Sequence, residues 1–148
     1  MKITDSSHRL RELLRITGDT QNDMSIKTKI PKSSISHYIN GEREPRQEKL
    51  SMIADAYHVN PAWLMGIDVP MQTVNDLEHE LLDTRLNGFM IDINDGEKVL
   101  ENERKFWLLH EDYEKVKTAM ELYKLYESAT PEARALIDSF LKSSQQES

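Results

Sequence analysis

The stretch IPKSSISHYINGEREP, residues 30–45, carries an informative pattern in the first half of the chain. Its apolar residues recur at the three- and four-residue spacing of a helix, which predicts a short helix over residues 31–40 with one narrow buried side. The buried side carries Ile35, Tyr38 and Ile39. Pro31 suits the first turn of this helix, where its missing N–H costs nothing, and Gly41 suits its end.

The opposite side of this helix is predicted to be small, nearly neutral and rich in hydrogen-bonding groups. Its residues are Lys32, Ser33, Ser36, His37 and Asn40. A solvated helix surface more often carries Glu, Lys, Gln and Arg, which are better helix formers than Ser or Asn. Small polar side chains let a helix enter the DNA major groove and reach the base edges. From these residues alone, a DNA-reading helix and an ordinary polar surface helix remain equally open.

Four more short helices are expected around this segment. Residues 6–17 have the apolar spacing of an amphipathic helix that ends at Gly18, and residues 20–28 open with the Thr and Asp of a variant capping box. A fourth helix is expected to open at 44–45, and a fifth at Asn60 and Pro61. The sequence therefore predicts five short helices within residues 1–68.

Composition sets limits on the class of protein. The chain has 148 residues and no cysteine, which excludes disulfide frameworks, thiolate zinc sites and cysteine nucleophiles. No apolar run approaches the ~18 residues that a membrane span needs, so a soluble, cytoplasmic protein is expected. The net charge is −7, but residues 1–69 carry ten Lys and Arg against nine Asp and Glu, whereas residues 70–148 carry nine against seventeen. Residues 24–41 contain three lysines and no carboxylate, so an anionic partner meets no repulsion there.

Several segments of the first half match a known pattern in order. They are Gln21, Met24, Ile30, Ile35 and Tyr38, the NGEREP segment at 40–45 and the HVNPAWLMGID segment at 58–68. With these residues, 8–69 resemble the helix-turn-helix domain of the phage CI and Cro repressors and their relatives, often called XRE-like. The segment WLMGIDVPM, residues 63–71, looks like the domain-to-linker passage of CI-type repressors of temperate phages.

The resemblance implies roles for individual residues. In that family the third helix lies in the major groove, so the base-reading residues here would be Lys32, Ser33, Ser36, His37 and Asn40. Gln21 would meet a phosphate at the start of the second helix. Further phosphate partners would be Lys27, Lys29, Arg43 and Arg46, with Arg43 foremost because it follows the third helix directly.

Two positions depart from the family pattern. The family usually has Ala where the second helix crosses the third, and this chain has Ser25, which is nearly as small and can bond back to a helix carbonyl. The family usually has Gly in the turn, and this chain has Lys29. A left-handed conformation at Lys29 would cost roughly 1 kcal/mol relative to Gly.

The second half is expected to be a small, mostly helical region. Residues 69–75 are interpreted as a linker, 76–142 as an oligomerisation or partner-binding region, and 143–148 as a disordered tail. Within it, residues 74–84 form an acidic helix, and residues 88–109 suggest a β-hairpin because Asp95 and Gly96 favour a turn. Helices follow from Glu111 and from Thr130. The fold class is therefore mainly α, with a λ-repressor-like N-terminal domain and a β-hairpin in the second half.

The last two helices carry apolar stripes. The residues that define them are Tyr113, Val116, Met120, Tyr123, Leu136 and Phe140. The first hypothesis is that the stripes pack together and present a self-association surface, because specificity in this family generally comes from dimers on paired half-sites. The alternative, an intramolecular helical hairpin alone, stays open.

The sequence contains no catalytic or metal-binding pattern that we favour. HELLD, residues 79–83, lacks the second His of the zinc-protease motif, so His79 is interpreted as exposed. No nucleophile, cofactor or self-cleaving peptidase segment is expected, and the protein is not expected to be an enzyme. The resemblance implies a phage CI-type repressor that controls lysogeny or a mobile element as a dimer on palindromic operators, with an antirepressor protein as its inducing partner. An antitoxin whose acidic half binds a protein partner is the alternative.

Overall fold

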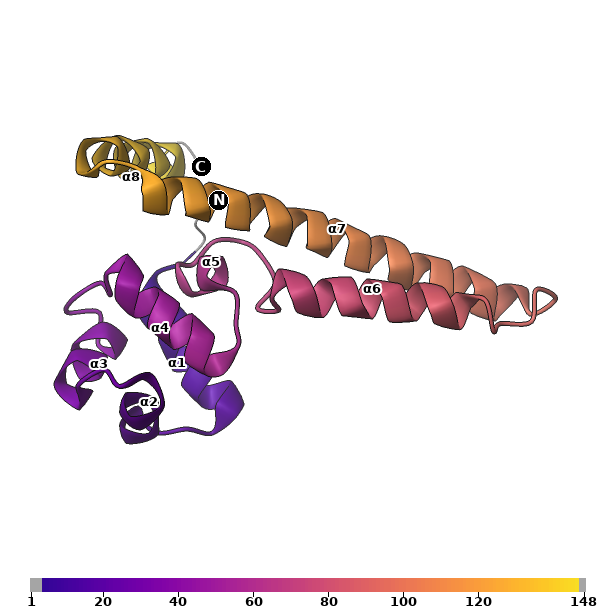
Figure 1. Ribbon diagram of the computed structural model, residues 1–148, viewed down its shortest axis with the longest axis horizontal. Helices are drawn as coiled ribbons and strands as arrows, with labels where there is room; N and C mark the ends of the chain where they lie inside the picture. The colour runs from indigo at the N-terminus through magenta and orange to yellow at the C-terminus, as the bar shows by residue number, and fades with distance from the viewer. Residues whose placement is uncertain (1–3, 147–148) are drawn as a thin grey trace.

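Eight helices form within residues 4–146, the part of the chain that this computed structural model describes (Figure 1). The side chains at 123, 127, 138 and 140–146 lie outside that description. The helices are α1 (Ser6–Thr17), α2 (Gln21–Thr28), α3 (Lys32–Ile39), α4 (Gln47–Tyr57), α5 (Pro61–Leu64), α6 (Val74–Gly88), α7 (Gly96–Ser128) and α8 (Pro131–Gln146).

The first five helices pack around one apolar core, as the sequence predicts. Leu10 and Leu13 of α1, Met24 of α2, Ile35 of α3 and Ile53 of α4 are buried at 1% exposure or less. These residues recur on one side of each helix, so each helix turns its apolar stripe inward. The apolar side of α3 therefore packs on the core, and its opposite side faces solvent.

The predicted helix ends of α1 and α2 are confirmed. The Asp5 carboxylate accepts from the N–H of His8 at 2.8 Å at the start of α1, and Gly18 ends the helix with φ of +73°. At the start of α2, Thr20 and Asp23 form a reciprocal capping box. Local signals of this kind fix helix ends because they satisfy backbone groups that the helix itself leaves unpaired.

The turn between α2 and α3 is tight and left-handed. Lys29 has φ of +58°, the left-handed conformation considered for this position from the sequence. The Ser25 hydroxyl donates to the carbonyl of Ile30 at 2.7 Å, so it bonds across the turn and not to a carbonyl of its own helix. The N–H of Ile30 donates to the Thr28 hydroxyl at 3.3 Å. These side-chain bonds hold the turn that sets the angle between α2 and α3.

The segment after α5 is packed on the N-terminal core. The N–H of Asn60 donates to the carbonyl of Met71 at 2.9 Å, and its side-chain amide donates to the carbonyl of Pro70 at 3.4 Å. Val69 and Met71 pack against the core. The first residues of the predicted 69–75 linker are thus attached to the domain, because their apolar side chains gain by burial.

The β-hairpin predicted over residues 88–109 is wrong. No strand is present in residues 4–146; α6 runs to Gly88 and α7 begins at Gly96. Asp95 is the N-cap of α7, where its carboxylate accepts from the N–H of Lys98 at 3.3 Å and pairs with the Lys98 ammonium at 2.9 Å. Asp followed by Gly suits a hairpin turn, but Asp is equally a preferred N-cap, and here the cap prevails.

Helices α6 and α7 form an antiparallel pair that extends away from α1–α5 (Figure 1). The Arg85 guanidinium lies over the Phe106 ring at 5.6 Å, and Lys105 pairs with Glu80 at 3.8 Å. Near the turn, the pair is so close that a Cβ on Gly88 would lie 2.7 Å from the Asn102 amide nitrogen. An α-helical hairpin thus takes the place of the expected β-hairpin.

The 33-residue helix α7 then passes beside α5 (Figure 1). Val116 and Ala119 are buried in this part of α7. Helix α8 follows, and the Arg134 guanidinium donates to the carbonyl of Tyr126 at 2.9 Å. A disordered tail was expected over residues 143–148, but α8 extends to Gln146. Once a helix has formed, each added residue costs little free energy.

Candidate nucleic-acid interface

Helix α3 lies on the side of the N-terminal domain that faces away from the α6–α7 pair (Figure 1). Ile35, Tyr38 and Ile39 bury its inner side. The five predicted reading residues share the outer side: Lys32, Ser33, His37 and Asn40 are exposed, and Ser36 is half-buried. The structure therefore brings these five side chains onto one accessible face.

The end of α3 is a Schellman motif, which is a paired backbone closure of a helix C-terminus. Gly41 takes φ of +74° and donates its N–H to the carbonyl of Tyr38 at 3.2 Å. The N–H of Glu42 donates to the carbonyl of His37 at 3.0 Å, and the N–H of Arg43 reaches the same carbonyl at 3.3 Å. This closure needs a left-handed residue after the helix, which Gly supplies without steric cost.

A carboxylate lies beside two of the reading residues. Nδ1 of His37 is 2.5 Å from Oε2 of Glu42, and the Asn40 amide donates to Oε1 of Glu42 at 3.4 Å. The hydrogen bonds from His37 and then Asn40 hold the pKa of the Glu42 carboxyl below its usual range. Glu42 is not among the site residues predicted from the sequence. The signal that could have identified it is Gly41, because a glycine that ends a helix brings the next residue close to the last turn, where His37 lies.

The start of α2 offers backbone donors. The capping box occupies the N–H of Thr20, which donates to Asp23 at 2.8 Å, and the N–H of Asp23, which donates to Thr20 at 3.2 Å. The N–H groups of Gln21 and Asn22 are the other first-turn donors at this end. Gln21 is half-buried at this position, so its side chain and these N–H groups are suited to one phosphate.

Lys27, predicted as a phosphate partner, makes contacts within the N-terminal domain. Its ammonium pairs with Asp19 at 2.5 Å and lies 5.2 Å from the centre of the Tyr57 ring. The Tyr57 hydroxyl donates to Asp19 at 2.7 Å. The bonds from Lys27 and Tyr57 lower the pKa of Asp19, while burial and then the Asp19 bond raise the pKa of Tyr57. Lys27 thus ties α2 to α4. Lys27, Lys29, Arg43 and Arg46 are all exposed.

A further arginine supports the end of α3. The Arg11 guanidinium donates to the carbonyl of Ile39 at 3.2 Å and to the Ser7 hydroxyl at 3.4 Å. A cation at a helix C-terminus is favourable because the free carbonyls there carry partial negative charge. No local sequence pattern identifies this contact, since Arg11 and Ile39 meet only through the packing of α1 against α3.

The predicted self-association residues do not form one exposed surface. Val116 is fully buried, Tyr113 and Met120 are half-buried, and Leu136 is 72% exposed. The side chains of Tyr123 and Phe140 lie outside the described residues. The first stripe is buried at Val116 because α7 packs beside α5 within the same chain.

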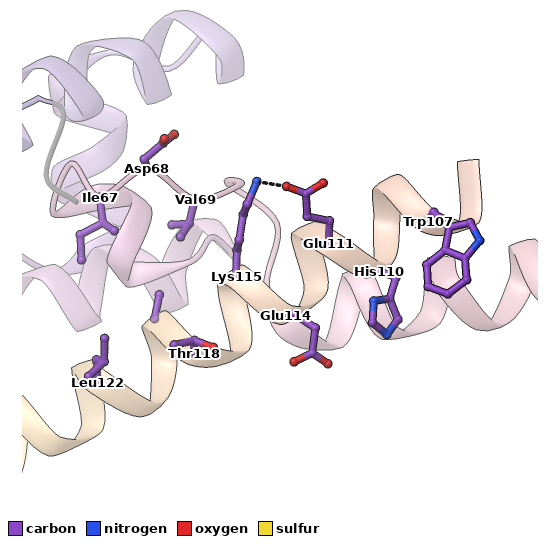
Figure 2. Close-up of a pocket in the computed structure, with 11 residues that line it drawn as sticks. Ile67, Asp68, Val69, Trp107, His110, Glu111, Glu114, Lys115, Thr118 and Leu122 are labelled. Carbon is purple, nitrogen blue, oxygen red and sulfur yellow. Dashed lines mark ion pairs between the residues drawn. The ribbon is translucent and has the colours of Figure 1, made fainter. Parts of the chain in front are cut away.

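An open groove of about 770 Å³ lies between residues 67–69 and α7 (Figure 2). Ile67, Asp68 and Val69 lie on one side, and α7 supplies the other, where Lys115 pairs with Glu111 at 2.7 Å. Across the described range, no three His, Asp or Glu side chains gather as a metal site. None of the helices in that range is both long and apolar enough to cross a membrane.

Residues 10–64 match the family model described as helix-turn-helix. The matched range runs from within α1 to the end of α5 and includes the whole outer face of α3. No curated protein sequence matches the chain. The match supports a DNA-binding transcriptional regulator whose helix-turn-helix domain is the N-terminal five-helix unit.

Proposed function

We propose that the protein is a sequence-specific repressor of the CI type that binds near-palindromic operators as a dimer. The observation that carries this proposal is the outer face of α3, where Lys32, Ser33, Ser36, His37 and Asn40 lie together above a buried apolar side. Hydroxyl, imidazole and amide groups can donate to or accept from base edges in the major groove. The protein would repress by occupying a promoter, without chemistry of its own.

Phosphate contacts would fix the register of α3 in the groove. The first-turn N–H groups of α2 would bind one phosphate, with Gln21 beside them. Lys29, Arg43 and Arg46 are exposed around α3 and would contact others. Such contacts orient the domain without reading sequence, so base preference would depend on α3 alone.

Dimerisation would use the C-terminal half of the chain. Large apolar side chains are exposed on α7 and α8: Leu122, Leu125, Leu136 and Ile137. One helix-turn-helix module buries little DNA surface, and pairing two modules on two half-sites raises both affinity and specificity. The dimer would also control lysogeny or a mobile element if its operators lie at the promoter of such genes.

The direct test is a footprint of the purified protein on DNA upstream of its own gene, followed by selection from random duplexes. We expect protection of two similar half-sites separated by about one or more helical turns. The logarithm of the binding constant should fall by roughly 0.9 for each neutralised phosphate as the logarithm of salt concentration rises. Equal affinity for every duplex would contradict sequence-specific repression.

A second candidate function is partner binding by the acidic half, as in an antitoxin. Its support is the connection between α6 and α7, where Phe89, Met90 and Ile93 are exposed by 79%, 86% and 86%. An apolar tip on an acidic helical pair suits a protein partner, either a toxin or an antirepressor that releases the operator. Co-purification with the product of a small neighbouring gene would favour the toxin, whereas loss of operator binding in the complex would favour the antirepressor.

A further inference from the structure

The contact between Glu42 and His37 follows from the backbone that ends α3. In a Schellman motif the residue two positions past the cap lies beside the residue three positions before it, and the two side chains usually make an apolar contact. Here those residues are Glu42 and His37, joined by the N–H of Glu42 and the carbonyl of His37 at 3.0 Å. The closure that Gly41 permits thus places a carboxylate, in place of an apolar group, against the imidazole.

The carboxylate decides which nitrogen of His37 carries a proton. Glu42 is exposed, and an exposed glutamate is ionised at neutral pH, where its carboxylate only accepts hydrogen bonds. Nδ1 of His37, 2.5 Å away, must therefore be the donor. In the neutral imidazole the other nitrogen, Nε2, then carries the lone pair and is an acceptor.

The same carboxylate orients Asn40. The side-chain nitrogen of Asn40 donates to Oε1 of Glu42 at 3.4 Å and to the Ser36 hydroxyl at 3.5 Å. An amide nitrogen has two hydrogens, so both are directed to these protein groups. The remaining group of Asn40 is its carbonyl oxygen, again an acceptor.

We propose that Glu42 is a positioning residue that makes His37 and Asn40 present acceptor atoms to the major groove. Acceptors there match the amino groups of adenine N6 and cytosine N4, and they meet repulsion from the O6 and N7 acceptors of guanine. The C-terminal part of α3 therefore selects an exposed amino group and rejects guanine at the contacted base. This inference rests on the proposed function, because it concerns how the α3 face reads its operator.

The experiment starts from the operator that the wild-type protein selects. The base opposite His37 is the position at which His37→Ala relaxes the preference. At that base, adenine is replaced by purine, or cytosine by 2-pyrimidinone, each of which lacks the amino group. We expect the wild-type protein to lose about 3- to 10-fold in affinity for the analogue, the size of one hydrogen bond. Glu42→Ala should lose this discrimination, because His37 is then free to turn its N–H outward.

A matched control distinguishes the positioning of His37 by Glu42 from the effect of removing one negative charge. Glu48→Ala removes the same charge from a side chain that is 79% exposed near the start of α4, so it should shift affinity for all duplexes without changing the response to the analogue. A response to the analogue that persists in Glu42→Ala would overturn the inference. So would an equal loss of the response in Glu48→Ala.

The tautomer of His37 gives a readout that needs no DNA. The ¹⁵N shifts of the neutral ring in the full-length protein should show a protonated Nδ1 in the wild type and a mixture in Glu42→Ala. A wild-type ring protonated at Nε2 would overturn the inference. A wild type that has the expected tautomer but selects no DNA sequence would refute the proposed function and, with it, the reading role of Glu42. Selective DNA binding without the tautomer would refute only the inference.

Discussion

At the scale of single residues, the turn before α3 is under backbone strain. Lys29 holds φ of +58°, a region that costs a residue with a Cβ roughly 1 kcal/mol relative to Gly. The strain persists because Ser25 bonds across the turn to Ile30 and α2 and α3 are both anchored in the core. The turn is thus held by its surroundings and not by the preference of Lys29.

Replacing Lys29 with Gly should therefore stabilise the protein. We expect Lys29→Gly to raise the free energy of unfolding by about 0.5 kcal/mol, less than the full strain because Gly also gains freedom in the unfolded chain. Denaturant unfolding measures this change. The control is Lys29→Ala, which removes the same charge but keeps the Cβ, and it should not stabilise. Equal effects of the two substitutions would show that charge, and not φ, matters at this position.

A pH effect is expected from the Lys27–Asp19–Tyr57 cluster. The folded protein lowers the pKa of Asp19, chiefly through its bond from Lys27, so the cluster contributes stability above the ordinary pKa of 3.8 and loses it as the pH falls through the lowered value. Asp19→Asn removes this contribution. The stability difference between wild type and variant should be largest near neutral pH and shrink below about pH 4. Thermal unfolding across pH measures it, and a difference that grows in acid would contradict this assignment.

At the scale of secondary-structure elements, tertiary packing decides whether a segment with mixed signals becomes a helix or a strand. Residues 88–109 contain β-favouring side chains and a turn signal, yet they form the end of α6, a connection and the start of α7. The N-cap at Asp95 and the packing of Phe106 beneath Arg85 on the neighbouring helix favour the helical state. Local propensity is a weak preference, and tertiary contacts readily override it.

Substitutions in and around α3 should distinguish residues that contact bases from residues that contact phosphates. Ser33→Ala removes a hydroxyl from the outer face, so it should change which base is preferred at one position. The free-energy difference between the preferred base and the others there should fall by at most about 1–3 kcal/mol. Arg43→Ala removes an exposed charge after α3, so it should weaken binding to all sequences alike and reduce the slope of the salt dependence by about one phosphate. Binding to a panel of operator variants at several salt concentrations distinguishes them. A uniform loss from Ser33→Ala would contradict base reading by that residue.

At the scale of the whole molecule, one long helix connects the two halves of the chain. Helix α7 pairs with α6 over its first half and passes beside α5 further on, where Val116 and Ala119 are buried. The C-terminal half therefore packs against the N-terminal domain through the contact between α7 and α5.

The dimer that we propose should depend on exposed, not buried, apolar residues. Leu136 is 72% exposed on α8, so Leu136→Asp should weaken self-association while leaving the unfolding temperature of the protein nearly unchanged. Val116→Asp places a charge in the fully buried position beside α5 and should instead destabilise the fold. Sedimentation and thermal unfolding measure the two effects.

Truncation gives the complementary test of the dimer. A protein cut after Met71 keeps the bond from Asn60 to Met71 and the whole helix-turn-helix core. It should sediment as a monomer and bind an operator more weakly than the full chain. A truncated protein that still dimerised and bound as tightly as the full chain would contradict a role for the C-terminal half.

Local patterns in the amino-acid sequence were enough to predict the helices in the first half of this protein. The capping pair Thr20 and Asp23, the stops at Gly18 and Gly41, and the apolar spacing around Ile35 depend on neighbours within a few residues, so five helices and the outer face of α3 could be predicted. Only the tertiary structure showed that Lys27 is bound to Asp19, that Val116 is buried beside α5 and that residues 88–109 are helical. These outcomes depend on residues far apart in the chain, and their contacts form only when whole helices pack together. Glu42 lies between the two cases, because its position follows from the turn at Gly41 but its contacts with His37 and Asn40 are visible only in three dimensions.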